Sequence, residues 1–138
     1  QNTEYGIQKK TKHQTPNTKS QSFIQGAHGM NTVLVYMTAG DRTEAERIGS
    51  VLVETRLAAC VNIMDPMESI YRWEGRIEKD RETVLIAKTT QEKVPELKEK
   101  VVEVHSYDCP CVLVLPVSDG HAPFLAWIQG QVSSLNAL

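Results

Sequence analysis

The sequence is poor in features that mark whole classes of protein: it has only three cysteines, few aromatic residues and no long apolar run. Its apolar runs are short, such as Val112 to Leu115, whereas a transmembrane helix needs roughly 20 apolar residues, so we expect no membrane partner. Residues 1–30 lack the apolar core of a secretory signal. The odd number of cysteines, with Cys109 and Cys111 too close for an ordinary disulfide loop, favours a reduced, cytoplasmic setting.

Basic charge is also scarce where the chain is predicted to fold. Residues 1–30 carry four lysines and one glutamate, which leaves 11 basic and 16 acidic residues for 31–138. Nucleic-acid binding needs clustered Lys and Arg against the phosphates, so we predict no nucleic-acid partner. The nucleophile-elbow, P-loop, dinucleotide-binding and HExxH motifs are absent, and we therefore predict that the protein is not an enzyme.

Residues 1–29 are polar, rich in Gln, Thr, Lys and Ser, and show no hydrophobic period. Such a segment cannot bury enough apolar surface to offset its ordering entropy, so we predict a disordered tail. Its origin stays open: it is either an artificial leader ahead of a natural start at Met30, or a natural targeting leader. The predicted domain spans residues 30–138.

Hydrophobic patterning divides this domain into strands and helices. Thr32–Thr38 is a β-branched and aromatic run typical of a buried strand. Asp41 and Thr43 are N-cap candidates, each followed three residues later by Glu, for a helix that ends near Arg56-Leu57. Residues 58–64 form the second predicted strand.

A long hairpin is predicted next. Proline lacks the N–H donor of a central strand, so we expect a bulge or kink at Asp65-Pro66 and a strand that resumes over Ser69–Trp73. Glu74-Gly75 is a tight-turn signal, after which the chain returns through Glu82–Lys88.

The second half repeats the pattern. A helix with Pro95 in its first turn carries one apolar face, made by Val94, Leu97, Val101 and Val104. Val112–Val117 is the fourth strand, and Pro123 opens a short C-terminal helix. The order predicts an α+β, ferredoxin-like βαββαβ sandwich with a long hairpin between its second and third strands. One face of its sheet stays bare, and we expect a closed homo-oligomer to cover it.

Four separated segments resemble, in order and spacing, the CutA family, which is named for tolerance of divalent cations. They are Arg56–Asn62, Ser69–Ile77, His105–Pro110 and Phe124–Trp127, and the resemblance spans nearly all of residues 31–138. It implies a subunit similar to the PII signalling proteins, assembled as a compact homotrimer whose hairpins pair with neighbouring subunits. It also implies a response to metal ions with copper binding, and in animals an association with the membrane anchoring of acetylcholinesterase. No settled catalytic activity comes with the family.

The chain departs from the family around Pro110, where Cys109 and Cys111 stand in place of the usual non-cysteine residues. Thiolate and imidazole ligands suit copper, so the candidate ligands for copper or another divalent cation are Cys60, His105, Cys109 and Cys111. Each has a structural alternative: Cys60 as a small buried hydrophobe, His105 bound to helix-terminal carbonyls, and the cysteine pair as an incidental change. A completed site would need a further ligand beside the pair, from His105 or from a symmetry-related chain.

The resemblance also implies a cleft between subunits, for which the candidate residues are Tyr71, Trp73, Glu82, Lys88, Tyr107 and Trp127. Polar groups that converge on an apolar cleft are typical of a small-molecule site. In the alternative, Trp73 and Trp127 anchor the trimer interface. Two functions therefore stay open: a homotrimeric metal-tolerance protein that binds copper, and a PII-like regulatory or scaffold protein that binds a small ligand in this cleft.

Overall fold

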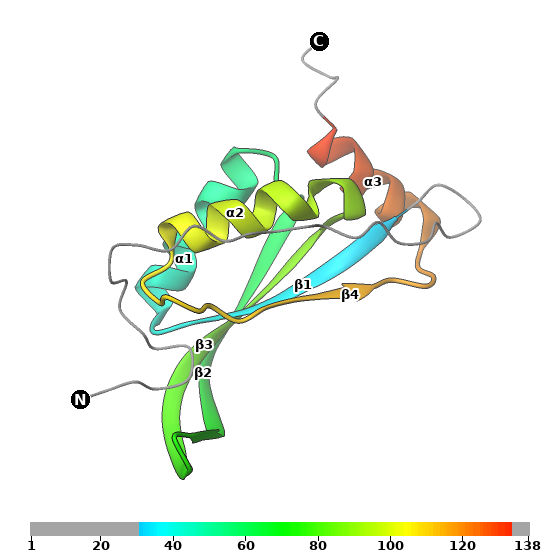
Figure 1. The fold of residues 1–138 in the computed structure, drawn as a ribbon. Coiled ribbons are helices and arrows are strands. Elements are labelled where there is room, and N and C mark those ends of the chain that lie inside the picture. Colours follow the sequence, from blue (N-terminus) through cyan, green and yellow to red (C-terminus); the bar gives the residue numbers. More distant parts are fainter. Residues whose placement is uncertain (1–30, 134–138) are drawn as a thin grey trace.

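The computed structural model describes residues 31–133, in which two helices cover one face of a four-stranded antiparallel sheet and a third helix lies at one end (Figure 1). The predicted tail over residues 1–29 lies outside the described residues. The elements are β1 (Thr32–Ala39), α1 (Arg42–Glu54), β2 (Cys60–Trp73), β3 (Arg76–Thr90), a 3₁₀ turn (Gln91–Lys93), α2 (Val94–Val104), β4 (Val112–Pro116) and α3 (Ala122–Val132). The predicted βαββαβ order with a C-terminal helix is confirmed. No helix within this part of the chain is long and apolar enough to cross a membrane.

The start of α1 settles which N-cap candidate is used. Asp41 is the cap, because its carboxylate accepts a hydrogen bond of 2.8 Å from the Glu44 N–H. Thr43 lies inside the helix and caps nothing. The helix ends at Glu54, slightly earlier than predicted, because Arg56 takes a left-handed conformation with φ of 60°.

The strand order is β2-β3-β1-β4, with antiparallel pairing throughout. Alternate residues of each strand face the helices and form the core with α1 and α2. Its fully buried side chains include Val35, Met37, Ile48, Leu52, Leu85, Leu97 and Val101. Burying each side chain of this size stabilises the fold by about 1.5–3 kcal/mol, so this layer fixes the sheet and both helices.

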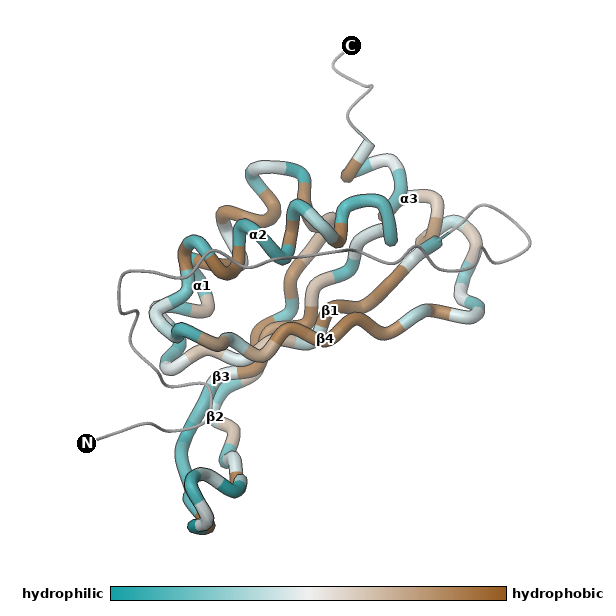
Figure 2. The backbone as a smooth tube through the Cα atoms, viewed as in Figure 1, coloured by the Kyte–Doolittle hydropathy of each residue, from teal (hydrophilic) through white to brown (hydrophobic). Residues whose placement is uncertain are grey.

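The opposite face of the sheet, here called the open face, is apolar, but no helix of the described residues covers it over β4. Register pairs Leu34 with Leu115 and Tyr36 with Leu113, so these side chains share this face. Leu113 and Leu115 are 58% and 46% exposed. Figure 2 shows hydrophobic residues running along both β1 and β4. An exposed apolar surface of this kind marks an interaction site.

The hairpin of β2 and β3 projects well beyond the sheet (Figure 1). The last pair between β1 and β3 is Ala39 with Thr83, so residues 67–82 form a two-stranded ribbon, here called the arm. The arm begins at a register shift between Met64 and Met67, where the sequence predicted a bulge or kink. Its tip is a two-residue turn with positive φ at Glu74 and at Gly75, a conformation that suits glycine.

Candidate functional site

A buried polar cluster lies at the base of the arm. The carboxylate of Glu82, which is only 4% exposed, accepts hydrogen bonds of 2.7 Å from the Ser69 hydroxyl and 3.2 Å from the Tyr107 hydroxyl. Burial raises the pKa of Tyr107, and the neighbouring Glu82 carboxylate raises it further. Tyr107 therefore remains a hydrogen-bond donor throughout the neutral range. Of the predicted cleft residues, the structure brings Glu82 and Tyr107 into direct contact.

His105 supports Tyr107 and uses both ring nitrogens to do so. Its Nδ1 accepts a 3.0 Å bond from the Tyr107 N–H, so its Nε2 carries the proton and donates at 2.8 Å to the Thr38 carbonyl. The ring is 2% exposed and lies 4.5 Å, centroid to centroid, from the Tyr107 ring. The carbonyl it binds belongs to β1 and not to the preceding helix. In this conformation, His105 has no free lone pair for a metal ion.

Helix α1 locks the loop that carries this pair. Glu44 accepts hydrogen bonds from the backbone N–H groups of Gly40 and Ser106, at 3.1 and 2.8 Å. Arg47 contacts Glu44 and donates a 2.8 Å bond to the Val104 carbonyl. Burial by itself raises the pKa of Glu44, but hydrogen bonds from the Ser106 side chain and from the N–H groups of Gly40 and Ser106 outweigh it and lower that pKa. Residues 104–107 are thus held to the start of α1.

The two neighbouring thiols lie further along the same loop. Cys109 is exposed at a bend, and Cys111 is half-buried just before β4. Burial raises the pKa of the Cys111 thiol, the Glu82 carboxylate and Cys109 add to the rise, and a hydrogen bond with the Thr38 side chain opposes it. Cys111 therefore belongs to the surroundings of Glu82, while Cys109 faces solvent.

Cys60 lies in a different part of the subunit. In β2, Cys60 pairs with Lys88 of β3, which in turn pairs with Leu34 of β1. Cys111 directly precedes β4, on the other side of β1, at the level of Thr38. Three strand spacings and four residues of strand separate the two cysteines by on the order of 20 Å. Within residues 31–133, no three His, Cys, Asp or Glu side chains are grouped closely enough to hold a metal ion.

The predicted ligand set is therefore divided by the structure. The residues of the described part of the chain do not fit a site with three or four ligands from one subunit, but Cys109 and Cys111 offer a pair of thiols to a soft cation. The four predicted ligands stay a prediction, with the cysteine pair as its best-placed part.

The predicted aromatic residues fall on two separate surfaces. Tyr71 and Trp73 lie on the arm, where the Tyr71 hydroxyl bonds the Asp80 carboxylate. Trp127 stacks on Phe124 of α3 with 5.5 Å between centroids, and the Lys88 ammonium lies 5.5 Å from the Phe124 ring. Within one subunit, Lys88 and Trp127 are thus remote from the cluster at Glu82.

The arm has two chemically different faces, which the linear sequence hides. Cross-strand register places Tyr71, Trp73, Glu78, Asp80 and Glu82 on one face, here called the acidic face, which also holds Arg76. The other, here called the basic face, holds Ile70, Arg72, Ile77, Lys79 and Arg81, together with Glu68. Ile70 and Ile77 are 65% and 59% exposed. Period-two alternation across a correctly registered hairpin would have revealed this segregation.

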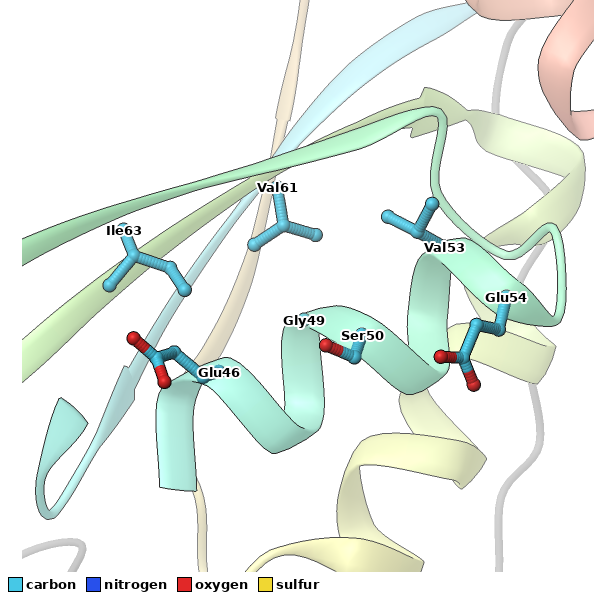
Figure 3. Close-up of a pocket in the computed structure, with 7 residues that line it drawn as sticks. All are labelled: Glu46, Gly49, Ser50, Val53, Glu54, Val61 and Ile63. Atoms are coloured by element: carbon cyan, nitrogen blue, oxygen red, sulfur yellow. The ribbon is translucent and has the colours of Figure 1, made fainter. Parts of the chain in front are cut away.

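A groove that sequence reasoning missed runs between α1 and the free edge of β2 (Figure 3). It has a volume of about 380 Å³, an apolar side made by Val61 and Ile63, and the carboxylates of Glu46 and Glu54 along α1. None of the predicted site residues lines it. It is formed where Gly49 brings the helix close to the strand, a packing detail with no sequence motif.

The architecture defines a small ferredoxin-like α+β subunit whose distinguishing part is the long arm. Solved structures similar to this chain include the periplasmic divalent cation tolerance protein CutA of Archaeoglobus fulgidus, at 43% identity and a TM-score of 0.72 over 74% of this chain and 99% of that one. Another is the divalent cation tolerance protein Cut A1 of Thermus thermophilus, at 39% identity and a TM-score of 0.73 over the same shares.

Sequence relatives agree. The divalent-cation tolerance protein CutA of Archaeoglobus fulgidus is 45% identical over 98 residues, covering 71% of this chain and 95% of that protein. Protein CutA of Mus musculus is 35% identical over 123 residues, covering 89% of this chain and 67% of that protein. The model of the CutA1 divalent ion tolerance protein family matches residues 33–131. The chain belongs to this family, as the resemblance of its four segments implied.

Proposed function

We propose that this protein is a homotrimeric, cytoplasmic metal-tolerance protein that responds to metal ions by binding copper in its monovalent form through Cys109 and Cys111. The names of its relatives support the link to divalent cations. The observation that carries the copper assignment is the placement of an exposed thiol and a half-buried thiol two residues apart on one loop. Thiolates are soft ligands that select copper(I). The buried His105 offers no ligand atom, because both of its ring nitrogens are hydrogen-bonded.

The assembly part of the proposal rests on surfaces that one subunit leaves uncovered. The acidic and basic faces of the arm are complementary in charge but different in composition. A contact between two different patches is heterologous, and it forms a closed ring instead of an isologous dimer when the rotation between subunits closes. The free edges of β2 and β4 and the apolar open face would be covered in such a ring.

Light scattering on the purified protein tests the assembly. The expected mass is that of a trimer, and Arg72→Glu with Lys79→Glu, which reverses the basic face, is expected to dissociate it. Lys98→Glu on the exposed side of α2 is the matched control and should leave the mass unchanged. Trp73→Ala should also weaken the assembly. A dimer, or a trimer indifferent to all arm variants, would contradict this part of the proposal.

Anaerobic titration of the reduced protein with copper(I) against a competing chelator tests the metal. We expect tight binding of one ion per chain that is lost in Cys109→Ser/Cys111→Ser and retained in Cys60→Ser. Retention in the double variant with loss in Cys60→Ser would move the site to Cys60. Binding no tighter than that of a generic exposed thiol would remove copper from the proposal.

The alternative function, a PII-like regulatory or scaffold protein without catalytic activity, is favoured by the cluster at the arm base. Glu82, Ser69 and Tyr107 form a buried polar site beside the loop of residues 105–111. A saturable organic ligand whose binding is insensitive to thiol blocking would support this function over the first.

A further inference from the structure

The direction of the arm depends on few contacts. Within residues 31–133, no third strand flanks the part of β3 that precedes Thr83, and an isolated two-stranded ribbon is marginally stable. Side-chain hydrogen bonds tie its base to the rest of the subunit: from Tyr107 to Glu82 at 3.2 Å, and from the Tyr36 hydroxyl to the Met67 sulfur at 3.5 Å. Sulfur is a weak acceptor, so the bond between Tyr107 and buried Glu82 is the stronger brace.

The brace and the thiols share one short loop and one strand residue. Cys109 and Cys111 follow Tyr107 by two and four residues. Thr38 contacts both ends of the loop, since its carbonyl accepts from His105 and its side chain bonds the Cys111 thiol. A movement of Cys111 therefore bears on the residues that hold Tyr107 in place.

We infer that binding of a soft metal cation by Cys109 and Cys111 loosens the bond between Tyr107 and Glu82 and so changes the position of the arm. This inference rests on the proposed function and adds its regulation: the arm responds to the metal. Binding of one monovalent ion by two thiols releases two protons to solvent and leaves the site with one negative charge. That charge arises beside the buried Glu82 carboxylate, and two like charges in a shielded site repel each other.

A shared ion also ties the Cys111 sulfur to that of Cys109. The loop is anchored at Ser106 by Glu44, so any adjustment falls on the segment from Tyr107 to Cys111. Two arrangements result: a braced arm, as in the present structure, and a released arm with the thiols occupied. The arm carries the surfaces proposed for assembly, so metal binding would alter contacts between subunits.

Fluorescence of Trp73 at the arm tip reports on this change. The chain has two tryptophans, so Trp127→Phe leaves Trp73 as the only one. The probe is silver(I), a redox-inert stand-in for copper(I). Eight residues of β3 separate the level of the thiols from the tip, on the order of 25 Å, so an ion bound at the thiols of the same subunit does not touch the indole.

We expect silver(I) to shift the Trp73 emission maximum in the Trp127→Phe protein, and the shift to vanish in Cys109→Ser/Cys111→Ser. Adding Tyr107→Phe should abolish the shift while silver binding, followed by chelator competition, is retained. Gly40→Ala, whose added Cβ would lie 3.3 Å from the Tyr107 hydroxyl, disturbs the same bond and serves if Tyr107→Phe does not fold. Cys60→Ser should leave the shift unchanged.

Two outcomes overturn the inference alone: silver binds at the thiols without shifting Trp73, or the shift persists undiminished in Tyr107→Phe, which has no hydroxyl to form the brace. Failure of silver to bind at the thiols overturns it together with the copper assignment. The binding readout and the fluorescence readout therefore separate the two claims.

Discussion

Removing the hydroxyl of Tyr107 should destabilise the protein more than its small size suggests. Phenylalanine keeps the ring that packs 4.5 Å from His105, so the change deletes one donor and little else. The acceptor is the carboxylate of Glu82 in a site where that residue is 4% exposed. A hydrogen bond to a charged group contributes about 1.5–3 kcal/mol. We expect Tyr107→Phe to lower the free energy of unfolding by that amount.

Urea unfolding at a fixed protein concentration measures this loss, and Tyr36→Phe is the matched control. The Tyr36 hydroxyl donates to a methionine sulfur, a weak acceptor, at 3.5 Å, so its removal should cost less than the loss of the bond to the Glu82 carboxylate. In a Glu82→Gln background the effect of Tyr107→Phe should shrink, because the charged acceptor is gone. Equal costs for the two tyrosine variants, or no shrinkage in that background, would refute the role given to this bond.

Three further predictions follow from the same network and from one helix end. Because the folded-state pKa of Tyr107 is raised, its contribution is present below the ordinary tyrosine pKa of about 10 and is lost as the pH rises through the folded-state value. Stability of the wild type, measured by urea unfolding across alkaline pH, should therefore fall more steeply than that of Tyr107→Phe. The folded-state pKa of Glu44 is lowered from 4.5, so its contribution is present above that pH and is lost as the pH falls through the lower folded value. Glu44→Gln should flatten this acid limb, and an unchanged limb would count against the anchoring role of Glu44. Arg56 has a φ of 60° and donates to the Gln131 carbonyl, a bond that both Arg56→Gly and Arg56→Ala remove. Only glycine relieves the left-handed strain, so the glycine variant should be more stable than the alanine variant by about 1 kcal/mol, and equal stabilities would contradict this explanation.

Local patterning was enough to place the elements of the fold. The β-branched run at Thr32–Thr38 became β1, and Pro66 marked the register shift because a proline cannot donate to a ladder. For the N-cap of α1 the sequence left two candidates, Asp41 and Thr43, since each is followed by Glu three residues later. Only the packed structure decides between them, in favour of Asp41. Helix α1 ends at Glu54, before the left-handed Arg56, and helix propensity alone does not indicate that end.

The candidate site was predicted less completely, because it depends on distances between segments. The resemblance to the family pointed to Glu82 and Tyr107, which the structure brings together. They could not show that both ring nitrogens of His105 bond backbone groups, or that Cys60 and Cys111 lie near opposite edges of the sheet. The segregated faces of the arm follow from cross-strand register, which a single chain of letters does not display.

Native mass spectrometry of the reduced, copper(I)-loaded protein tests the central claim most directly, because one spectrum counts both chains and ions. The account predicts a trimer that carries one copper ion per chain, and a trimer without copper for Cys109→Ser/Cys111→Ser. A metal-free wild type, or a double variant that keeps its full complement of copper, would contradict it.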